Sequence, residues 1–372
     1  MKSMTVARPL RILMTCLISL AGGLLFTSIH IPVPWLLGPM IAVLIASRFL
    51  NVAKVPLYWP SYIRNAGIMI VGYSIGLAFT RQALVQIVHQ LPSMLLMALL
   101  LMLLCVLIAY IASRLSGIDF PTMMTGCVPG GLSQMITLAE EIRGVNMTVV
   151  TFMQVTRLMM IVIIVPLLVF SPMFASSPPG LSASEALETI QANVTPLFPN
   201  IVPFAVVCML FTFLGHKIKF PTVFLLGPLL GTALLGQSGL QGPAMPSFVL
   251  NAAQFMVGSY VGLLLRPEKL QRKTLTITVA LASSLVLLVG AYGLSVLLTR
   301  IHALTPITGF LSMAPGGMDQ MGIIAHEVNA DLSIVSAYQL FRTFFIFFLV
   351  PSLLRMLFRF LAGRAAAAAH RS

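Results

Sequence analysis

The sequence predicts an all-α polytopic membrane protein with two inverted repeats of about five spans each and a broken or re-entrant PGG segment in each repeat. Three observations lead to this prediction. Of the 372 residues, 58% are hydrophobic and 8% are charged, whereas about 25% of the residues in a soluble domain are charged. The apolar residues gather in long runs, and the second half of the chain repeats motifs of the first. The composition excludes a soluble enzyme, a disordered regulator and a coiled coil.

The apolar runs mark the expected helices in order. In the first half they cover residues 12–29, 35–46, 66–79, 93–112 and 149–170, with a segment of mixed character at 121–141. In the second half they cover residues 201–215, 223–235, 248–265, 275–298, 305–327 and 332–349. Runs this long and this apolar exclude the alternating strands of a transmembrane barrel. The chain therefore divides into an N-terminal membrane repeat (1–170), an extracytoplasmic linker loop (171–200) and a C-terminal membrane repeat with a short basic tail (201–372).

The second half copies the first at a spacing of about half the chain. The motif PGGLSQM at 129–135 returns as PGGMDQM at 315–321, so the two copies start 186 residues apart. Three further pairs follow the same order: LLGP at 36–39 and 225–228, VG followed by GL at 71–77 and 257–263, and Q-x-x-R at 154–157 and 339–342. Because chance similarity does not produce such an ordered set, we interpret the chain as an internal duplication.

The distribution of Lys and Arg sets the orientation of the repeats. Residues 171–200 contain no Lys or Arg, so the positive-inside rule places this loop outside and the basic termini inside. Each repeat then crosses the membrane an odd number of times, and the two repeats are inverted, as in many secondary transporters. The alternative, a parallel pair of six-span halves, would put the loop inside. The predicted location is a bacterial inner membrane, with many spans, both termini cytoplasmic and residues 12–29 retained as the first span.

The two PGG segments are the first candidate site. A Pro followed by two glycines interrupts an α-helix, and interrupted backbone at membrane depth is buried in protein or lines a cavity. Free N–H groups and a helix N-terminus just after the glycines would attract an anion. The predicted substrate-binding residues here are Gly130, Gly131, Ser133, Gln134, Gly316, Gly317, Asp319 and Gln320. The alternative is a packing kink or a tight loop at the membrane edge.

The second candidate site is the repeated Gln-x-x-Arg motif, Gln154 with Arg157 and Gln339 with Arg342. The i, i+3 spacing places Gln and Arg on one helix face. An Arg near the middle of a membrane costs about 2.5–3.5 kcal/mol, so it faces a polar interior or a partner. We expect these four residues to bind the same anionic substrate, with one guanidinium from each repeat. The alternative is a structural ion pair of each Arg with Glu141 or Glu327.

Acidic residues form the third candidate site. Of the nine acids in the chain, five lie in or just after the PGG segments: Glu140, Glu141, Asp319, Glu327 and Asp331. Carboxylates in a membrane cavity bind protons or sodium ions. Glu141 and Glu327 are therefore the predicted ion-coupling residues, for H⁺ or Na⁺, and His326 adds a titratable imidazole. The alternative is that these acids solvate helix ends near the membrane interface.

Other chemistry finds little support in the sequence. His326 and Glu327 form a lone pair without the spacing of a metal site, and no phosphate-binding or dinucleotide motif occurs. All four cysteines lie in apolar stretches and are interpreted as small buried residues: Cys16, Cys105, Cys127 and Cys208. We therefore expect no enzyme activity, no cofactor, no metal and no nucleic-acid partner. The expected partners are the lipid bilayer, a small anion, H⁺ or Na⁺, and a second copy of the chain in a homodimer.

The motifs resemble those of the bacterial AbrB-type membrane protein family. The resemblance rests on the duplicated PGG segments, each followed by a Q-x-x-R helix that ends in Pro, and on LLGP near the start of each half. The stretch APGGMDQMGIIAHEVNADLSIVSAYQLFRTF (314–344) is especially close to the family pattern. The resemblance covers nearly the whole chain and implies a fold like that of cation/proton antiporters and anion transporters. Family members carry labels as ammonia monooxygenases or as regulators of another gene's expression, and the resemblance identifies no substrate.

Three functions compete on these grounds. The inverted repeats, the broken segments and the intramembrane Arg residues favour a secondary transporter of a small anionic solute, with its site at the repeat interface. The family labels alone support the alternative, a membrane protein that regulates gene expression indirectly. A monooxygenase would need copper or iron ligands, which the scarce and scattered His and Cys residues do not provide.

Overall fold

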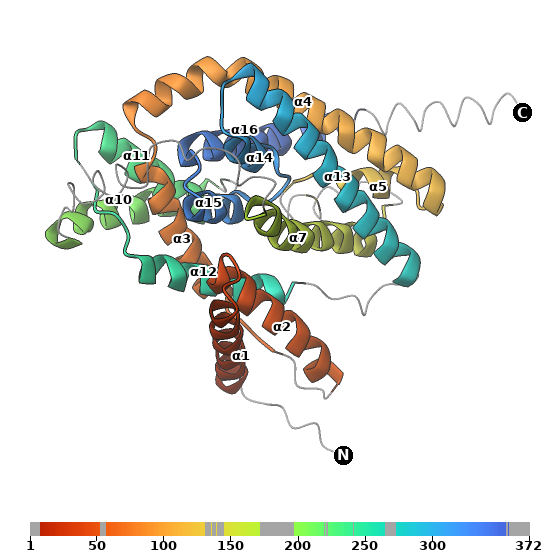
Figure 1. Cartoon of the computed structure of the whole chain (residues 1–372), viewed down its shortest axis with the longest axis horizontal. Helices are drawn as coiled ribbons and strands as arrows, with labels where there is room; N and C mark the ends of the chain where they lie inside the picture. Colours follow the sequence, from red (N-terminus) through yellow and green to blue (C-terminus); the bar gives the residue numbers. More distant parts are fainter. Residues whose placement is uncertain are drawn as a thin grey trace, which may run out of the picture.

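The computed structural model describes residues 8–52, 57–130, 135, 139, 145–171, 197–218, 220, 222–240, 242–264, 273–354 and 356, and all regular structure in these ranges is helical (Figure 1). The helices of the first half are α1 (Arg8–Ser28), α2 (Pro34–Val52), α3 (Ser61–Leu77), α4 (Arg81–Ser116), α5 (Phe120–Cys127) and α7 (Met147–Val169). Those of the second half are α10 (Leu197–Lys217), α11 (Val223–Gln237), α12 (Ser247–Gly262), α13 (Lys273–Ile301), α14 (Pro306–Met313), α15 (Met318–Glu327) and α16 (Leu332–Phe348). Most of the predicted linker loop and the basic tail lie outside these ranges.

Several helices have the length and composition of membrane spans. Four of them, α1, α4, α7 and α13, are long and apolar enough to cross a bilayer. The shorter helices α2, α10, α11 and α16 are also apolar. A helix satisfies its own backbone hydrogen bonds, which lipid cannot do for it. The protein is an all-α membrane protein, as predicted.

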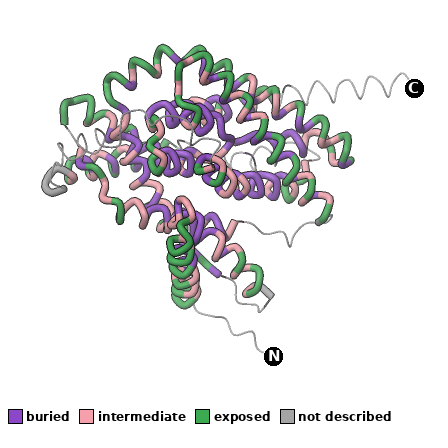
Figure 2. The backbone as a smooth tube through the Cα atoms, viewed as in Figure 1, coloured by how far each residue is buried: buried purple, intermediate pink, exposed green. Residues whose placement is uncertain are grey.

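Buried residues gather in the middle of the helix assembly (Figure 2). In α7, 67% of the most apolar window is buried, against 22% in α1 and 39% in α4. The exposed apolar side chains of α4 and α13 occupy equivalent positions in the two halves: Leu95, Leu99 and Leu103, and Leu281, Leu285 and Val289. The outer helices therefore present a surface suited to lipid, and α7 lies in the protein interior.

Helix α4 is much longer than the predicted run at 93–112. It spans 36 residues, from an N-cap at Thr80, whose hydroxyl accepts from the Ala83 N–H, to Gly117, which has a φ of 67°. At 1.5 Å per residue this is about 54 Å, more than the roughly 30 Å of a bilayer core. Hydropathy alone missed the first turns because they are polar, with Arg81 and Gln82 at the start. In Figure 1, α4 runs across the top of the helix assembly and α13 runs down its right half.

The two halves are interlocked through reciprocal glycine contacts. Gly72 of α3 lies against the Leu225 carbonyl of α11, and Gly258 of α12 lies against the Leu36 carbonyl of α2. In both places a Cβ would come within 3.0 Å of the carbonyl oxygen, so only glycine fits. Gly76 and Gly262 repeat the arrangement one helix turn later, against Leu229 and Met40. Each LLGP helix thus packs on the VG helix of the other half.

Equivalent residues also contact their own counterparts. Gly67 of α3 lies against Ala253 of α12, and Gly290 of α13 lies against Leu104 of α4. Both pairs are 186 residues apart, the spacing of the PGG motifs. Reciprocal contacts together with such self-contacts relate the halves by an approximate twofold axis. The orientation of this axis in the membrane, and hence the inverted topology, stays a prediction.

Candidate functional site

Each PGG motif follows a short helix, and the two short helices occupy equivalent positions in the two halves. Helix α5 ends at Cys127 and α14 ends at Met313. After each, the N–H of the first glycine turns back to the carbonyl two residues earlier, from Gly130 to Val128 and from Gly316 to Ala314, both at 2.8 Å. Helix α15 begins directly after the second turn. Gly131, Ser133 and Gln134, predicted at the corresponding place in the first half, lie outside the described residues.

In the first half, Gln154 and Arg157 bind the open end of α5. The Gln154 amide donates to the carbonyls of Thr125, Gly126 and Val128 at 2.9, 3.2 and 2.9 Å. Arg157 Nη1 donates to the Val128 carbonyl at 2.9 Å, and its Nη2 donates to Gln154 Oε1 at 2.7 Å. The last carbonyls of a helix lack N–H partners and carry partial negative charge. The Gln-x-x-Arg motif supplies the missing donors.

The second half repeats this arrangement. The Gln339 amide donates to the carbonyls of Leu311 and Ala314 at 2.7 and 3.0 Å. Arg342 Nη1 donates to the Ala314 carbonyl at 2.9 Å, and its Nη2 donates to Gly316 at 3.0 Å and also to Gln339 Oε1. The sequence analysis placed Gln and Arg on one helix face, and the structure shows the two side chains bonded to each other in both halves.

The alternative considered for Arg342, a structural ion pair with Glu327, does not form. Glu327, at the far end of α15, accepts a hydrogen bond of 2.8 Å from the Gln254 amide of α12, and the Arg342 guanidinium is held by carbonyls instead. A helix C-terminus offers several carbonyl oxygens in one direction, which suits the guanidinium fork. The other acid considered for such an ion pair, Glu141, lies outside the described residues.

The two guanidinium groups lie close together in the interior. Arg157 and Arg342 are 7% and 6% exposed. Each lies within electrostatic range of the other, and the buried side chain of Cys105 in α4 lies within that range of both. Carbonyl dipoles compensate the two positive charges only in part. The described interior therefore holds two buried cations, one from each half of the chain.

A small pocket lies beside Arg157, and its two serines are not repeated in the other half of the duplication. It is lined by Arg157 with residues of α4, α5 and α13, including Ser283 and Ser284. Both hydroxyls donate to the Ala280 carbonyl of their own helix, at 3.2 and 2.6 Å, and a hydroxyl can rotate toward another acceptor. Arg157 Nε is buried and has no hydrogen-bond partner. At the positions that correspond to the two serines, the first half has Met97 and Ala98.

The start of α15 is already occupied by a carboxylate. Asp319 lies in the first turn of α15, where the partial positive charge of a helix N-terminus favours a carboxylate. The Gln320 amide donates to Asp319 Oδ2 at 2.9 Å. The anion site predicted at this helix N-terminus therefore contains a carboxylate of the chain itself, whereas the first half has Ser133 at the corresponding position.

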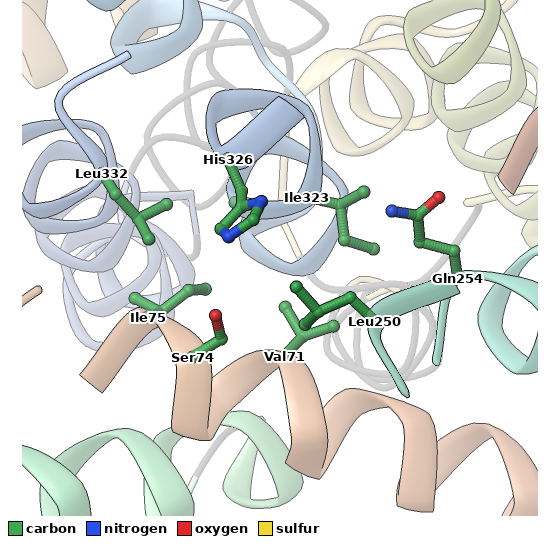
Figure 3. Close-up of a pocket in the computed structure, with 9 residues that line it drawn as sticks. Val71, Ser74, Ile75, Leu250, Gln254, Ile323, His326 and Leu332 are labelled. Carbon is green, nitrogen blue, oxygen red and sulfur yellow. The ribbon is translucent and has the colours of Figure 1, made fainter. Parts of the chain in front are cut away.

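A second pocket lies between α3, α12 and α15 (Figure 3). Its polar lining residues are Ser74, Gln254 and His326, and the imidazole points into the space beside Ser74 and Ile75. Ser74 and Gln254 escaped the sequence analysis. Gln254 carried one signal, a polar residue within the apolar run that contains VG, but nothing in that pattern indicated Glu327 as its partner.

The comparisons with known proteins agree with this architecture. Residues 35–358 match the model of the family described as transition state regulatory protein AbrB. The chain belongs to this family. The Bacillus subtilis (strain 168) protein YhjN is 28% identical over 358 residues, which are 91% of each chain. An Escherichia coli (strain K12) protein named "Putative regulator AbrB" is 27% identical over 356 residues, 95% of this chain and 98% of the relative. Similarity over this length places both halves of the duplication within the family.

Proposed function

We propose that the chain is a secondary transporter of a small anionic solute, with Arg157 as the main binding residue and Arg342 as its counterpart across the approximate twofold axis. The observation that carries this proposal is the pair of buried guanidiniums, which lie near each other and have backbone carbonyls and a Gln amide as partners. An ion in a low-dielectric interior is stable only when its charge is compensated. A bound anion would complete the compensation that the two helix ends begin.

One edge of the Arg157 guanidinium, formed by Nε and Nη2, suits a carboxylate or phosphate. Its Nε has no partner, and its Nη2 holds only the neutral Gln154 oxygen, which an anion can displace. Nε and Nη2 together form a fork that binds two oxygens of one anion. Ser283 and Ser284 line the same pocket and offer rotatable hydroxyl donors. These contacts support a binding site that belongs mainly to the first half.

Flux measurements test the proposal. The purified protein would be reconstituted into liposomes and supplied with radiolabelled monocarboxylates, dicarboxylates and inorganic phosphate, one at a time. We expect uptake of at least one probe, and at least a tenfold loss with Arg157→Gln. Arg114→Gln is the matched control, because Arg114 is exposed at the end of α4. Equal uptake by Arg157→Gln and by the unaltered protein would contradict the assigned site.

The alternative is an indirect regulatory role, which the names of the family and of the Escherichia coli relative favour. Regulation would then act through the concentration of a transported solute or through a partner protein. The same variants separate these cases. If regulation follows transport, Arg157→Gln should abolish both the flux and the change in gene expression. If it follows a partner protein, the expression change should survive loss of flux.

A further inference from the structure

At the start of α15, two side-chain oxygen atoms that accept hydrogen bonds lie close to the same glycine, Gly317. Asp319 Oδ1 and Gln320 Oε1 both lie over Gly317, where a Cβ would come within 3.0 Å of either oxygen. Gln320 is 3% exposed, and its Oε1 is buried and has no hydrogen-bond partner. The orientation of the amide is fixed, because its nitrogen donates to Asp319 Oδ2. A flipped amide would place its oxygen against the carboxylate.

A proton on Asp319 would satisfy the unpartnered oxygen. The ionised carboxylate accepts from the Gln320 amide at 2.9 Å. A protonated carboxyl gains an O–H donor, and Gln320 Oε1 is the neighbouring acceptor without a donor. A buried acceptor without a donor costs about 1–3 kcal/mol. The same two residues thus offer a complete set of hydrogen bonds only when the proton is bound.

The surroundings of Asp319 contain few other charges. From α3, the charge of Arg64 acts on Asp319 at longer range, because the Arg64 guanidinium donates to Asn65 Oδ1 and lies over the Tyr260 ring. From α16, Arg342 donates to the Gly316 carbonyl, while Tyr338 is bonded to Ser93 of α4. Helix α14 contributes no titratable side chain. On α15 itself, His326 and Glu327 lie at the opposite end of the helix.

One face of α15 connects this position to the pocket in Figure 3. Asp319, Gly322, Ile323 and His326 follow each other at three- and four-residue spacing, which places them on one side of the helix. The last three line the pocket, and His326 is exposed at its rim. Arg64, Val71 and Ile75 form the matching face of α3. The polar groups of this pocket are the imidazole of His326, the Ser74 hydroxyl and the Gln254 amide.

We infer that Asp319, with Gln320 as its hydrogen-bond partner, is a proton-binding site reached along the pocket that His326 borders. The inference rests on the proposed function only for its role, which is to supply the coupling ion for an anion held at Arg157. In this arrangement the first half of the chain binds the anion and the second half binds the proton. Ser133, which takes the place of Asp319 in the first half, cannot carry a charge.

Thermal unfolding and infrared spectra of the purified full chain in detergent test this site without any solute. As the pH is lowered, we expect the melting temperature to rise in one step, on the order of 2–4 °C, because the folded state binds the proton. A new carboxylic-acid C=O band should appear at the same pH. Asp319→Asn should remove both. Asp119→Asn is the matched control, since Asp119 is an exposed carboxylate at the start of α5, and it should keep both.

Two further measurements test the assignment: the variant Asp319→Glu and the exchange of choline for sodium ions. Asp319→Glu keeps a titratable carboxyl and should keep the step and the band at a displaced midpoint, even if Asp319→Asn fails to fold. Exchange of choline chloride for sodium chloride at constant ionic strength should not move the melting temperature. The inference is overturned if Asp319→Asn keeps the band, if Asp319→Glu leaves its midpoint unchanged, or if sodium replaces the effect of acid. Because no transported solute is needed, this outcome is independent of the flux test.

Discussion

Arg157 and Arg342 occupy equivalent positions, but their surroundings differ in one respect. Arg342 Nη2 reaches the Gly316 carbonyl as well as Gln339, whereas Arg157 has an unpartnered Nε beside a pocket with two hydroxyls. Arg342 therefore joins α16 to the turn after α14 more firmly. Arg157 retains more capacity to bind another molecule.

Replacement of each Arg by Lys should separate these roles. Lys carries the charge but lacks the fork, so Arg342→Lys should lose at least one charged hydrogen bond, worth about 1.5–3 kcal/mol of folding stability. Arg157→Lys should lower stability less and anion binding more. Thermal unfolding and flux measured on both variants check this difference. The opposite ranking in both assays would contradict it.

The two glycines of the second PGG motif should also differ in how well they tolerate replacement by Ala. A Cβ on Gly317 would press on Asp319 Oδ1 at 2.6 Å and on Gln320 Oε1, whereas a Cβ on Gly316 would meet the flexible tip of Met321 at 2.9 Å. We expect Gly317→Ala to cost about 1–3 kcal/mol and to displace the pH step assigned to Asp319. Gly316→Ala should cost less and leave the step in place. Parallel pH titrations of the melting temperature provide the measurement.

The sequence predicted the pairing of Gln with Arg because i, i+3 spacing is visible in the chain. It did not predict their partners. The carbonyls that Arg157 binds belong to Cys127 and Val128, about thirty residues away in sequence, and backbone carbonyls carry no residue-type signal. An acid was the natural expectation for a buried cation. A helix that ends inside the protein is an equally good partner, and only the three-dimensional arrangement reveals it.

At the scale of helices, glycines determine how closely the elements approach. The contacts of Gly72 with Leu225 and of Gly258 with Leu36 bring backbone against backbone. At such contacts the helices pack backbone against backbone, without side chains between them. The duplicated VG motif was visible in the sequence, but periodicity does not state which helix lies opposite, so the exchange of partners between halves was not predicted.

Alanine at these glycines should weaken the assembly. The new methyl group in Gly72→Ala or Gly258→Ala would fall within 3.0 Å of a backbone carbonyl oxygen that cannot move away independently. We expect a loss of about 1–3 kcal/mol for each. Gly293→Ala is the matched control in α13, because no atom lies within 4 Å of its Cβ position, and it should be neutral or stabilising by up to about 1 kcal/mol. Thermal unfolding of the three purified variants tests this expectation.

At the scale of the whole molecule, the halves meet along an approximate twofold axis that passes near Gly67 and Ala253 and near Leu104 and Gly290. The duplication in the sequence predicted that such a relation exists. Which side of the membrane each loop faces depends on charges in loops, many of which lie outside the described residues. The topology therefore needs its own experiment.

Cysteine labelling from each side of the membrane tests the inverted topology. Single cysteines at Ser182 and Ser372 should react on opposite sides, Ser182 with a membrane-impermeant reagent added outside and Ser372 only after permeabilisation. The background is low, because Cys105, Cys127 and Cys208 are buried, and Cys16 can be replaced by Ala. Labelling of both positions from the same side would contradict the inverted arrangement.

The exchange of partners between the halves has a consequence for biosynthesis. A ribosome completes α2 and α3 long before it reaches α11 and α12, the helices against which their glycine and carbonyl surfaces pack. Until then these surfaces have only lipid beside them, and the first half cannot assume its final packing while the chain is being inserted. Assembly must therefore wait until translation has passed α12, which ends at Gly262, and a transcript truncated at its midpoint would yield helices in the membrane without their proper neighbours.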